Sequence, residues 1–200
     1  RLEPREGEWN PDAITHYRQA VALNPAYHAA HSNLLFTLDF LPGQDTGQVF
    51  AEHLAWARQH AAPWEARQSP HANTREPDRP LRIGYVSPDL RSHAVAWFME
   101  PLLAHHAKAG YEIYCYASVA EPDQVTARLR SLVPHWRDIA GIGDGEAAAL
   151  IRDDRIDILV DLAGHTAGGR LPLFARKPAP LQMGYLGYLN STGLAAIDYR

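Results

Sequence analysis

Sulfur is scarce in this sequence of 200 residues, which contains one cysteine, Cys115, and two methionines. A single cysteine excludes both an internal disulfide and a zinc site built from several cysteines. Cys115 lies within the apolar run YEIYCYASV, where we expect a buried thiol of the hydrophobic core. Because the chain also lacks a charged-then-apolar leader and any apolar run near the ~20 residues of a membrane span, we expect a soluble, cytoplasmic protein that has no membrane partner.

The chain also lacks a large excess of charge of either sign. The chain has 19 lysines and arginines against 23 aspartates and glutamates, a formal net charge of −4. Without a basic surplus, binding to the phosphates of a nucleic acid is not expected. The proportions of hydrophobic (46%) and charged (21%) residues are those of a globular protein, which excludes disordered, collagen-like and coiled-coil classes.

The first third of the chain has the apolar periodicity of helices. Residues 13–25, 28–41 and 47–61 each follow this period, and the breaker LPGQD separates the last two. Small and aromatic residues in the first of these segments match the second helix of a tetratricopeptide repeat, which a proline closes. We therefore predict the end of a repeat array with linking helices over residues 1–62, its first helix lying before Arg1.

The rest of the chain reads as a linker followed by alternating strands and helices. Residues 63–80 hold four prolines and no periodicity, which is typical of a linker. Apolar runs predict strands over 81–87, 111–119, 135–139, 156–164 and 181–187, with helical segments at 94–108, 122–132 and 145–154. This alternation predicts a mostly parallel α/β sheet with right-handed crossovers over residues 81–200.

Three polar loops follow predicted strands, at the edge where parallel sheets bind ligands. The loop SPDLRSH contains His93, AGHTAGGR contains Gly164, His165 and Thr166, and GYLNSTG follows the last strand. The glycines allow close approach of the backbone to a ligand, although turn geometry alone also explains them. Asp161, at the end of a strand, is expected to orient His165 or a ligand.

Other motifs carry less information. The segment GIGDGE lacks the third glycine of a dinucleotide fingerprint, Glu146 standing in its place, and we expect Asp144 to cap the following helix. Asp157 is expected to close a turn before a buried strand. No HExxH motif occurs, and His53 and His60, seven residues apart, lack an obvious third ligand, so no metal site is predicted. No Gly-x-Ser-x-Gly motif supports a serine hydrolase.

The runs LRIGYVSPDLRSH and DILVDLAGHTAGGRLPLFARKPAPLQMGYLGYLNSTGL, the final IDYR and the preceding repeat helices resemble the protein O-linked N-acetylglucosamine transferases of glycosyltransferase family 41, particularly bacterial Spindly-like members. The resemblance implies repeats that lead into a two-lobed GT-B catalytic region, with each lobe Rossmann-like and UDP-GlcNAc between the lobes. It implies no metal and no other cofactor. We expect this chain to hold the last repeats and the first lobe, the second lobe being absent from it.

The resemblance also implies roles for individual residues. His93 falls on the histidine discussed as catalytic base or as a substrate-positioning group, and Thr166 falls on the loop that faces the sugar–diphosphate cleft, next to His165. Tyr188 lies in the LGY motif near the active site. Together with Gly164 and Asp161, these last three residues form the expected donor-binding set. The chain departs from the family where Ser92 and Ala94 flank His93 in place of Asn and Pro, and where Leu189 replaces the proline of LGYP.

The function implied is inverting transfer of N-acetylglucosamine from UDP-GlcNAc to serine or threonine hydroxyls. The partners implied are the UDP-sugar and a protein or peptide acceptor that binds along the repeats and the cleft. His93 has a near-neutral pKa suited to accepting the hydroxyl proton, although the diphosphate itself can take that proton. Two alternatives stay open. The first is a related transferase that moves another sugar, such as fucose, or that acts on asparagine. The second is a non-catalytic scaffold whose repeats bind peptides.

Overall fold

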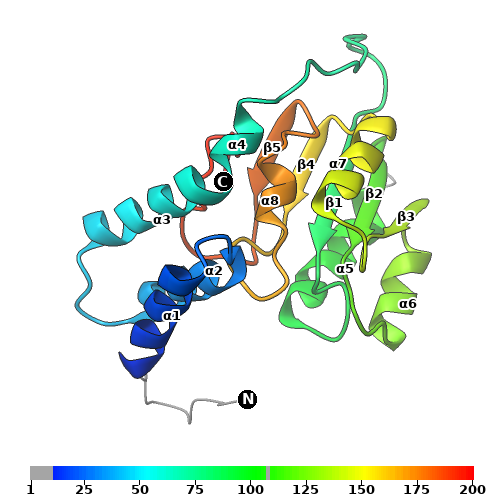
Figure 1. The fold of residues 1–200 in the computed structure, drawn as a ribbon. Helices are drawn as coiled ribbons and strands as arrows, with labels where there is room; N and C mark the ends of the chain where they lie inside the picture. The colour runs from blue at the N-terminus through cyan, green and yellow to red at the C-terminus, as the bar shows by residue number, and fades with distance from the viewer. Residues whose placement is uncertain (1–10, 107–108) are drawn as a thin grey trace.

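Apolar stripes pack three helices into the first part of the molecule. The computed structural model describes residues 11–106 and 109–200 and begins with α1 (Pro11–Leu23), α2 (His28–Phe40) and α3 (Thr46–His60). The small core that they share is made of Leu34, Leu38 and Val49, with Ile14 and Tyr17 at its edge. The three predicted helices are confirmed (Figure 1). The first ten residues of the predicted repeat region lie outside the described part of the chain.

A short helix opens the linker. α4 (Ala62–Glu65) carries a proline in its first turn and follows α3 at once, so the irregular linker begins about one turn later than predicted. Further along, Asn73 and Arg79 both bind the carboxylate of Asp157, at 2.7 Å and 2.6 Å. Asp157 therefore ties the linker to the sheet, where a simple turn-closing role was expected.

Five parallel strands form the sheet of the second part. They are β1 (Arg82–Ser87), β2 (Glu112–Ala117), β3 (His135–Asp138), β4 (Ile158–Asp161) and β5 (Leu181–Gly184). The strand order is β3-β2-β1-β4-β5, with every neighbouring pair parallel. This order reverses at β1, as in the first five strands of a Rossmann fold. All five predicted strands and the expected fold class, a Rossmann-like lobe after a helical segment, are confirmed.

Helices connect the strands and cover both faces of the sheet. They are α5 (Ala94–His106), α6 (Gln124–Ser131), α7 (Asp144–Asp153) and α8 (Leu171–Phe174). Separate clusters of buried side chains pack on the two faces, one around Phe174 and Ile151 and the other around Met99 and Leu129. Cys115 belongs to the second cluster and is fully buried, and burial raises the pKa of its thiol to about 12. The prediction of a core thiol is confirmed.

The prediction that Asp144 caps α7 is wrong. Gly143 occupies the capping position, and Asp144 is the first residue of the helix. The carboxylate of Asp144 instead accepts a hydrogen bond from Nε of Arg170 at 2.6 Å. This ion pair joins the start of α7 to the loop before α8.

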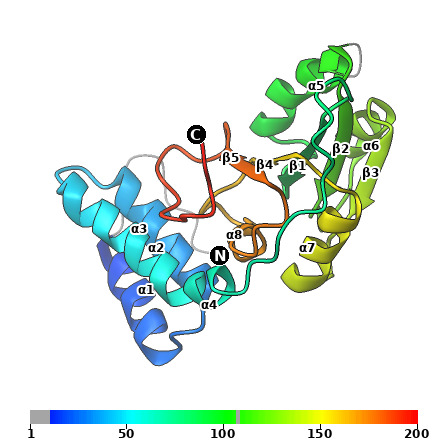
Figure 2. The ribbon, with the colours of Figure 1, turned by 90° about the horizontal axis from the view of Figure 1, so that it is seen from above.

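The chain after β5 lies between the two parts of the molecule. Figure 2 shows the orange and red segment, which follows β5, running between the sheet and helices α2 and α3. Within residues 11–106 and 109–200, none of the helices has the length and apolar character that crossing a membrane requires.

Candidate functional site

The parallel sheet brings the three polar loops to one edge. β1, β4 and β5 are neighbours with the same direction, so the loops that follow them emerge side by side. The first two loops touch, because a Cβ added at Gly168 would lie 2.9 Å from the Cβ of Pro88. The predicted rim of loops therefore exists as a continuous surface.

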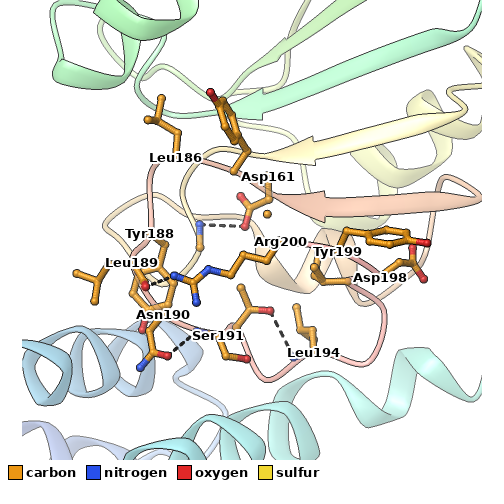
Figure 3. A pocket seen from close by; sticks show the side chains of 15 residues that line it. Asp161, Leu186, Tyr188, Leu189, Asn190, Ser191, Leu194, Asp198, Tyr199 and Arg200 are labelled. Carbon is orange, nitrogen blue, oxygen red and sulfur yellow. Dashed lines mark hydrogen bonds between the residues drawn. The ribbon is translucent and has the colours of Figure 1, made fainter.

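A pocket of about 610 Å³ opens beside the loops after β4 and β5 (Figure 3). Its lining residues are Asp161, Gly164, Gly184, Tyr185, Leu186, Tyr188, Leu189, Asn190, Ser191, Thr192, Leu194, Ile197, Asp198, Tyr199 and Arg200. Of the predicted donor-binding set, Asp161, Gly164 and Tyr188 thus share this pocket. Arg200 is the cation among these lining residues, and Asp198 is paired with Lys177.

Asp161 shapes the loop after β4 from beneath. The carboxylate is almost fully buried and accepts hydrogen bonds from the backbone nitrogens of Ala163 (3.0 Å) and Gly164 (2.9 Å). Burial raises the pKa of Asp161 to about 6, even though the two backbone donors favour the ionised form. The carboxylate of Asp161 holds the backbone of the loop and makes no hydrogen bond to the ring of His165, whose nitrogens face Ser32 and Thr192. That Asp161 orients a ligand stays a prediction, since it lines the pocket.

Gly164 packs directly under Tyr188. Its φ of +57° is a left-handed conformation that favours glycine, and a Cβ at this position would lie 2.4 Å from the Cβ of Tyr188. The hydroxyl of Thr166 donates to the carbonyl of Ala163 at 2.7 Å and closes the turn. Thr166 stands outside the lining of the pocket and supports the loop that forms it.

His165 turns away from the pocket. Its ring is fully buried, with Nδ1 3.1 Å from the hydroxyl oxygen of Ser32 on α2 and Nε2 3.0 Å from the carbonyl of Thr192. Burial lowers the pKa of His165 to about 3, so the ring is neutral. A residue predicted to bind the donor is therefore placed where it joins the helical segment to the loop after β5.

Tyr188 lines the pocket with its ring and reaches the helical segment with its hydroxyl. The hydroxyl donates to the carboxylate of Asp39 on α2 and lies 2.8 Å from Nε2 of His53 on α3. Sequence reasoning missed Asp39, and it considered His53 only as a metal ligand. No local pattern signals these contacts, since 149 residues separate Asp39 from Tyr188.

His93 lines a second hollow of about 630 Å³, which Ser92, Ala94, Trp97 and Phe98 also line. Its side chain is 42% exposed. Trp97 and Phe98 are among the most exposed aromatic side chains of the described residues, at 80% and 62%. The histidine therefore stands at the rim of the lobe, as predicted, beside an apolar surface.

The start of α5 fixes the tautomer of His93. Its Nδ1 accepts a hydrogen bond from the backbone nitrogen of Val95 at 3.3 Å, so the neutral ring carries its proton on Nε2. A carboxylate oxygen of Asp89 lies 3.8 Å from Nδ1. Burial raises the pKa of Asp89, although the proximity of His93 acts in the opposite direction. In this arrangement Nε2 of the neutral ring is a hydrogen-bond donor.

Metal-ligating side chains do not gather in the described part of the chain. No three His, Cys, Asp or Glu residues are placed there so as to hold one ion, and His53 and His60 make separate contacts. That the protein works without a metal stays a prediction.

Comparisons with known proteins place this geometry in a family. The sequence profile of Glycosyl transferase family 41 matches residues 25–200. The probable UDP-N-acetylglucosamine–peptide N-acetylglucosaminyltransferase SPINDLY of Oryza sativa subsp. japonica is 38% identical over 188 residues, which cover 92% of this chain and 20% of that protein. The UDP-N-acetylglucosamine–peptide N-acetylglucosaminyltransferase of Caenorhabditis elegans is 37% identical over 121 residues, covering 60% and 10%.

A solved structure supports the same relationship. A mutant of the Thermobaculum terrenum O-GlcNAc transferase superposes with a TM-score of 0.85 at 43% identity, covering 93% of this chain and 36% of that one. The chain thus spans about a fifth of the length of the rice relative and about a third of the solved structure.

Proposed function

Because the chain belongs to glycosyl transferase family 41, we propose that its protein transfers N-acetylglucosamine from UDP-GlcNAc to serine or threonine hydroxyls of proteins. The observation that carries the proposal is the family match over residues 25–200, which contains the whole pocket at the carboxyl edge of the sheet. Relatives named for this activity extend well beyond the matched segment, so this chain supplies one lobe and the helices before it.

The pocket charges suit an anionic donor. Arg200 places a guanidinium on the wall, a group that pairs well with diphosphate oxygens. Asp161 has its pKa raised by burial, and Lys177 neutralises Asp198, so the carboxylates of the wall repel a diphosphate less than two free ones would. We assign this pocket to one side of the donor cleft, with the other side supplied by the rest of the polypeptide.

The tautomer of His93 favours positioning over proton abstraction. Nε2–H of the neutral ring donates, and it orients an acceptor or donor oxygen without removing a proton. In the proposed step the acceptor oxygen forms a bond to the anomeric carbon, the bond to UDP breaks, and configuration inverts. The hydroxyl proton then passes to the departing diphosphate.

The test is transfer by the full-length protein, incubated with labelled UDP-GlcNAc and a serine- or threonine-containing acceptor. We expect labelled acceptor with inverted configuration, and equal activity when EDTA is added. Transfer of fucose from GDP-fucose, and not of N-acetylglucosamine from UDP-GlcNAc, would show that the proposed donor is wrong. Peptide binding without turnover of either donor would favour a scaffold.

The helices α1 to α3 are proposed to contact the protein acceptor before it enters the cleft. A cytoplasmic location stays a prediction from the sequence, and fractionation of cells that express the full-length protein tests it.

A further inference from the structure

A buried polar cluster joins the helical segment to the wall of the pocket. Asp39 and His53 belong to this cluster, and their side chains are 1% and 0% exposed. Asp39 accepts hydrogen bonds from the hydroxyl of Tyr188 and from the side-chain amide of Asn190, the latter at 2.6 Å. Tyr188 and Asn190 both line the pocket, so the carboxylate of Asp39 on α2 is hydrogen-bonded to the wall of the pocket at two points.

The hydroxyl of Tyr188 lies within hydrogen-bonding reach of both Asp39 and His53. Nδ1 of His53 lies 2.8 Å from the carbonyl of Val49, which only accepts, so Nδ1 carries a proton. The single hydroxyl proton of Tyr188 goes to Asp39, and Nε2 of His53 lies 2.8 Å from the same hydroxyl oxygen. One hydroxyl of Tyr188 therefore bridges Asp39 of α2 and His53 of α3.

The backbone of the loop after β5 is also held on two sides. A Cβ at Gly193 would lie 2.4 Å from the carbonyl oxygen of His53, so the loop backbone rests directly on α3. A Cβ at Gly187 would lie 1.7 Å from the carbonyl oxygen of Leu162 in the loop after β4. The loop is therefore clamped between the helical segment and the lobe (Figures 2 and 3).

From this arrangement we infer that Asp39 and His53 are positioning residues for the transferase site, acting through Tyr188. The ring of Tyr188 forms part of the pocket wall, and its hydroxyl is engaged by the helical segment. The helices before the lobe thus set the shape of the donor cleft in addition to any contact with an acceptor. The inference deepens the proposed function and rests on it for its kinetic consequences.

The test uses two variants of the full-length protein, Asp39→Asn and Tyr188→Phe. Asp39→Asn removes the charge with little change of volume, and Tyr188→Phe removes only the bridging hydroxyl. We expect each to lower kcat/KM for UDP-GlcNAc at least ~10-fold, because displacing a site wall by about 1 Å can cost as much as ~10²-fold. We also expect faster amide hydrogen exchange in residues 185–193, with exchange of the sheet unchanged.

Asp45→Ala is the matched control. Asp45 caps α3 through a 2.9 Å bond from the backbone nitrogen of Gln48 and is not one of the residues that line the pocket. The substitution Asp45→Ala removes this cap and weakens the helical segment. We therefore expect the Tm of the variant to fall, while kcat/KM and amide exchange at residues 185–193 stay near the parental values. If Asp39→Asn behaves like this control, the positioning role is overturned.

The two readouts separate the possible failures. Lower kcat/KM with unchanged exchange at residues 185–193 would show that the hydroxyl of Tyr188 acts on the substrate directly, which overturns positioning. If the parental protein transfers no sugar, the proposed function fails, and the exchange measurement still decides whether Asp39 holds the loop. Should Asp39→Asn fail to fold, Tyr188→Phe gives the same two readouts.

Discussion

His93 performs two tasks that different substitutions separate. It caps α5 through the bond from Val95, and it presents Nε2 at the rim of the lobe. We predict that His93→Ala lowers kcat/KM of the full-length enzyme by ~10²-fold or more, and stability by about 1 kcal/mol through loss of the cap. His93→Asn keeps a capping oxygen and an amide donor, so it should retain the stability and part of the activity.

The pH–rate profile distinguishes donation from proton abstraction by His93. A positioning donor leaves the shape of the profile unchanged in His93→Asn, whereas loss of the acidic limb of the profile would identify a general base. Activity of His93→Ala close to that of the parent would contradict both roles.

Gly164 is the second residue whose substitution gives a definite outcome. An alanine there meets Tyr188 at 2.4 Å and must adopt a φ of +57°, so both the loop and the pocket wall are strained. We predict that Gly164→Ala destabilises the lobe by about 2–5 kcal/mol, the sum of left-handed strain and overpacking. Thermal unfolding measures the change.

Gly184→Ala is the control for that substitution. Gly184 lines the same pocket, but a Cβ there meets nothing within 4 Å. Equal destabilisation by the two substitutions would show that the close contact with Tyr188 has no energetic consequence.

At the scale of elements, Asp157 joins the linker to the sheet. It accepts from Asn73 and Arg79, and also from the backbone nitrogen of Arg82 at 2.9 Å. Burial alone would raise the pKa of Asp157, but these hydrogen bonds outweigh it and lower the pKa. The stabilisation is therefore fully present above pH ~4 and is lost as the pH falls through the lowered pKa.

We predict that Asp157→Asn lowers stability at pH 7 by about 1–3 kcal/mol, because it leaves partly buried donors without their charged acceptor. The comparison is Asp138→Asn, which breaks the exposed pair with Arg130 at 3.3 Å and should cost less than ~1 kcal/mol. A denaturant titration of both variants measures the difference. Equal losses would mean that the linker is not anchored through Asp157.

The sequence pattern predicted the strands and the long helices but missed the two short helices, α4 and α8. α4 and α8 have four residues each and carry a proline in the first turn, so neither shows a helical period. Strands such as Ile158–Asp161 are buried on both faces and stand out as apolar runs between polar loops. The positions of Asp161 at the end of β4 and of His93 in the loop after β1 were also predictable, because topology alone sets the edge of the sheet at which they lie.

Contacts between the helices and the lobe were not predictable in this way. Asp39 and Tyr188 each follow the pattern of an ordinary helix or loop residue, and nothing near either one in sequence indicates the other. His165 shows the same limit, because its position in a glycine-rich loop indicates a ligand while its ring packs against α2. Such pairings depend on how the helices pack against the lobe, where Leu35 and Trp56 share one buried cluster with Phe174.

For the molecule as a whole, the docking of helices onto the lobe depends on neutral histidines. His165 stands edge-on to both Trp56 and His53 within this interface, at ring distances of 4.9 Å and 5.3 Å. Burial lowers the pKa of His165 to about 3 and that of His60 to about 4, and it also lowers the pKa of His31. Acid therefore favours the unfolded state, in which these rings are free to protonate.

The sign of this effect follows from proton binding. Between pH ~6.5 and the lowered pKa, the unfolded chain binds more protons at His165 than the folded one, so stability falls as the pH falls. Asp161 has the opposite effect on stability between pH ~6 and ~4. Because its pKa is raised, the folded chain binds a proton there before the unfolded chain does, which favours the folded state as the pH falls. His60 is partly exposed and contributes less than its lowered pKa suggests.

We predict that His165→Gln weakens the dependence of stability on pH, because glutamine can still bond to Ser32 and to the carbonyl of Thr192 without titrating. Between pH 6.5 and 5 the parent should lose roughly 2 kcal/mol more than the variant, at ~1.4 kcal/mol per pH unit. His16→Gln, on an exposed position of α1, should follow the parent. Denaturant titrations across this range measure the difference. Parallel curves for His165→Gln and the parent would mean that the ring protonates without undocking the helices, and the acid sensitivity would then have to arise elsewhere in the molecule.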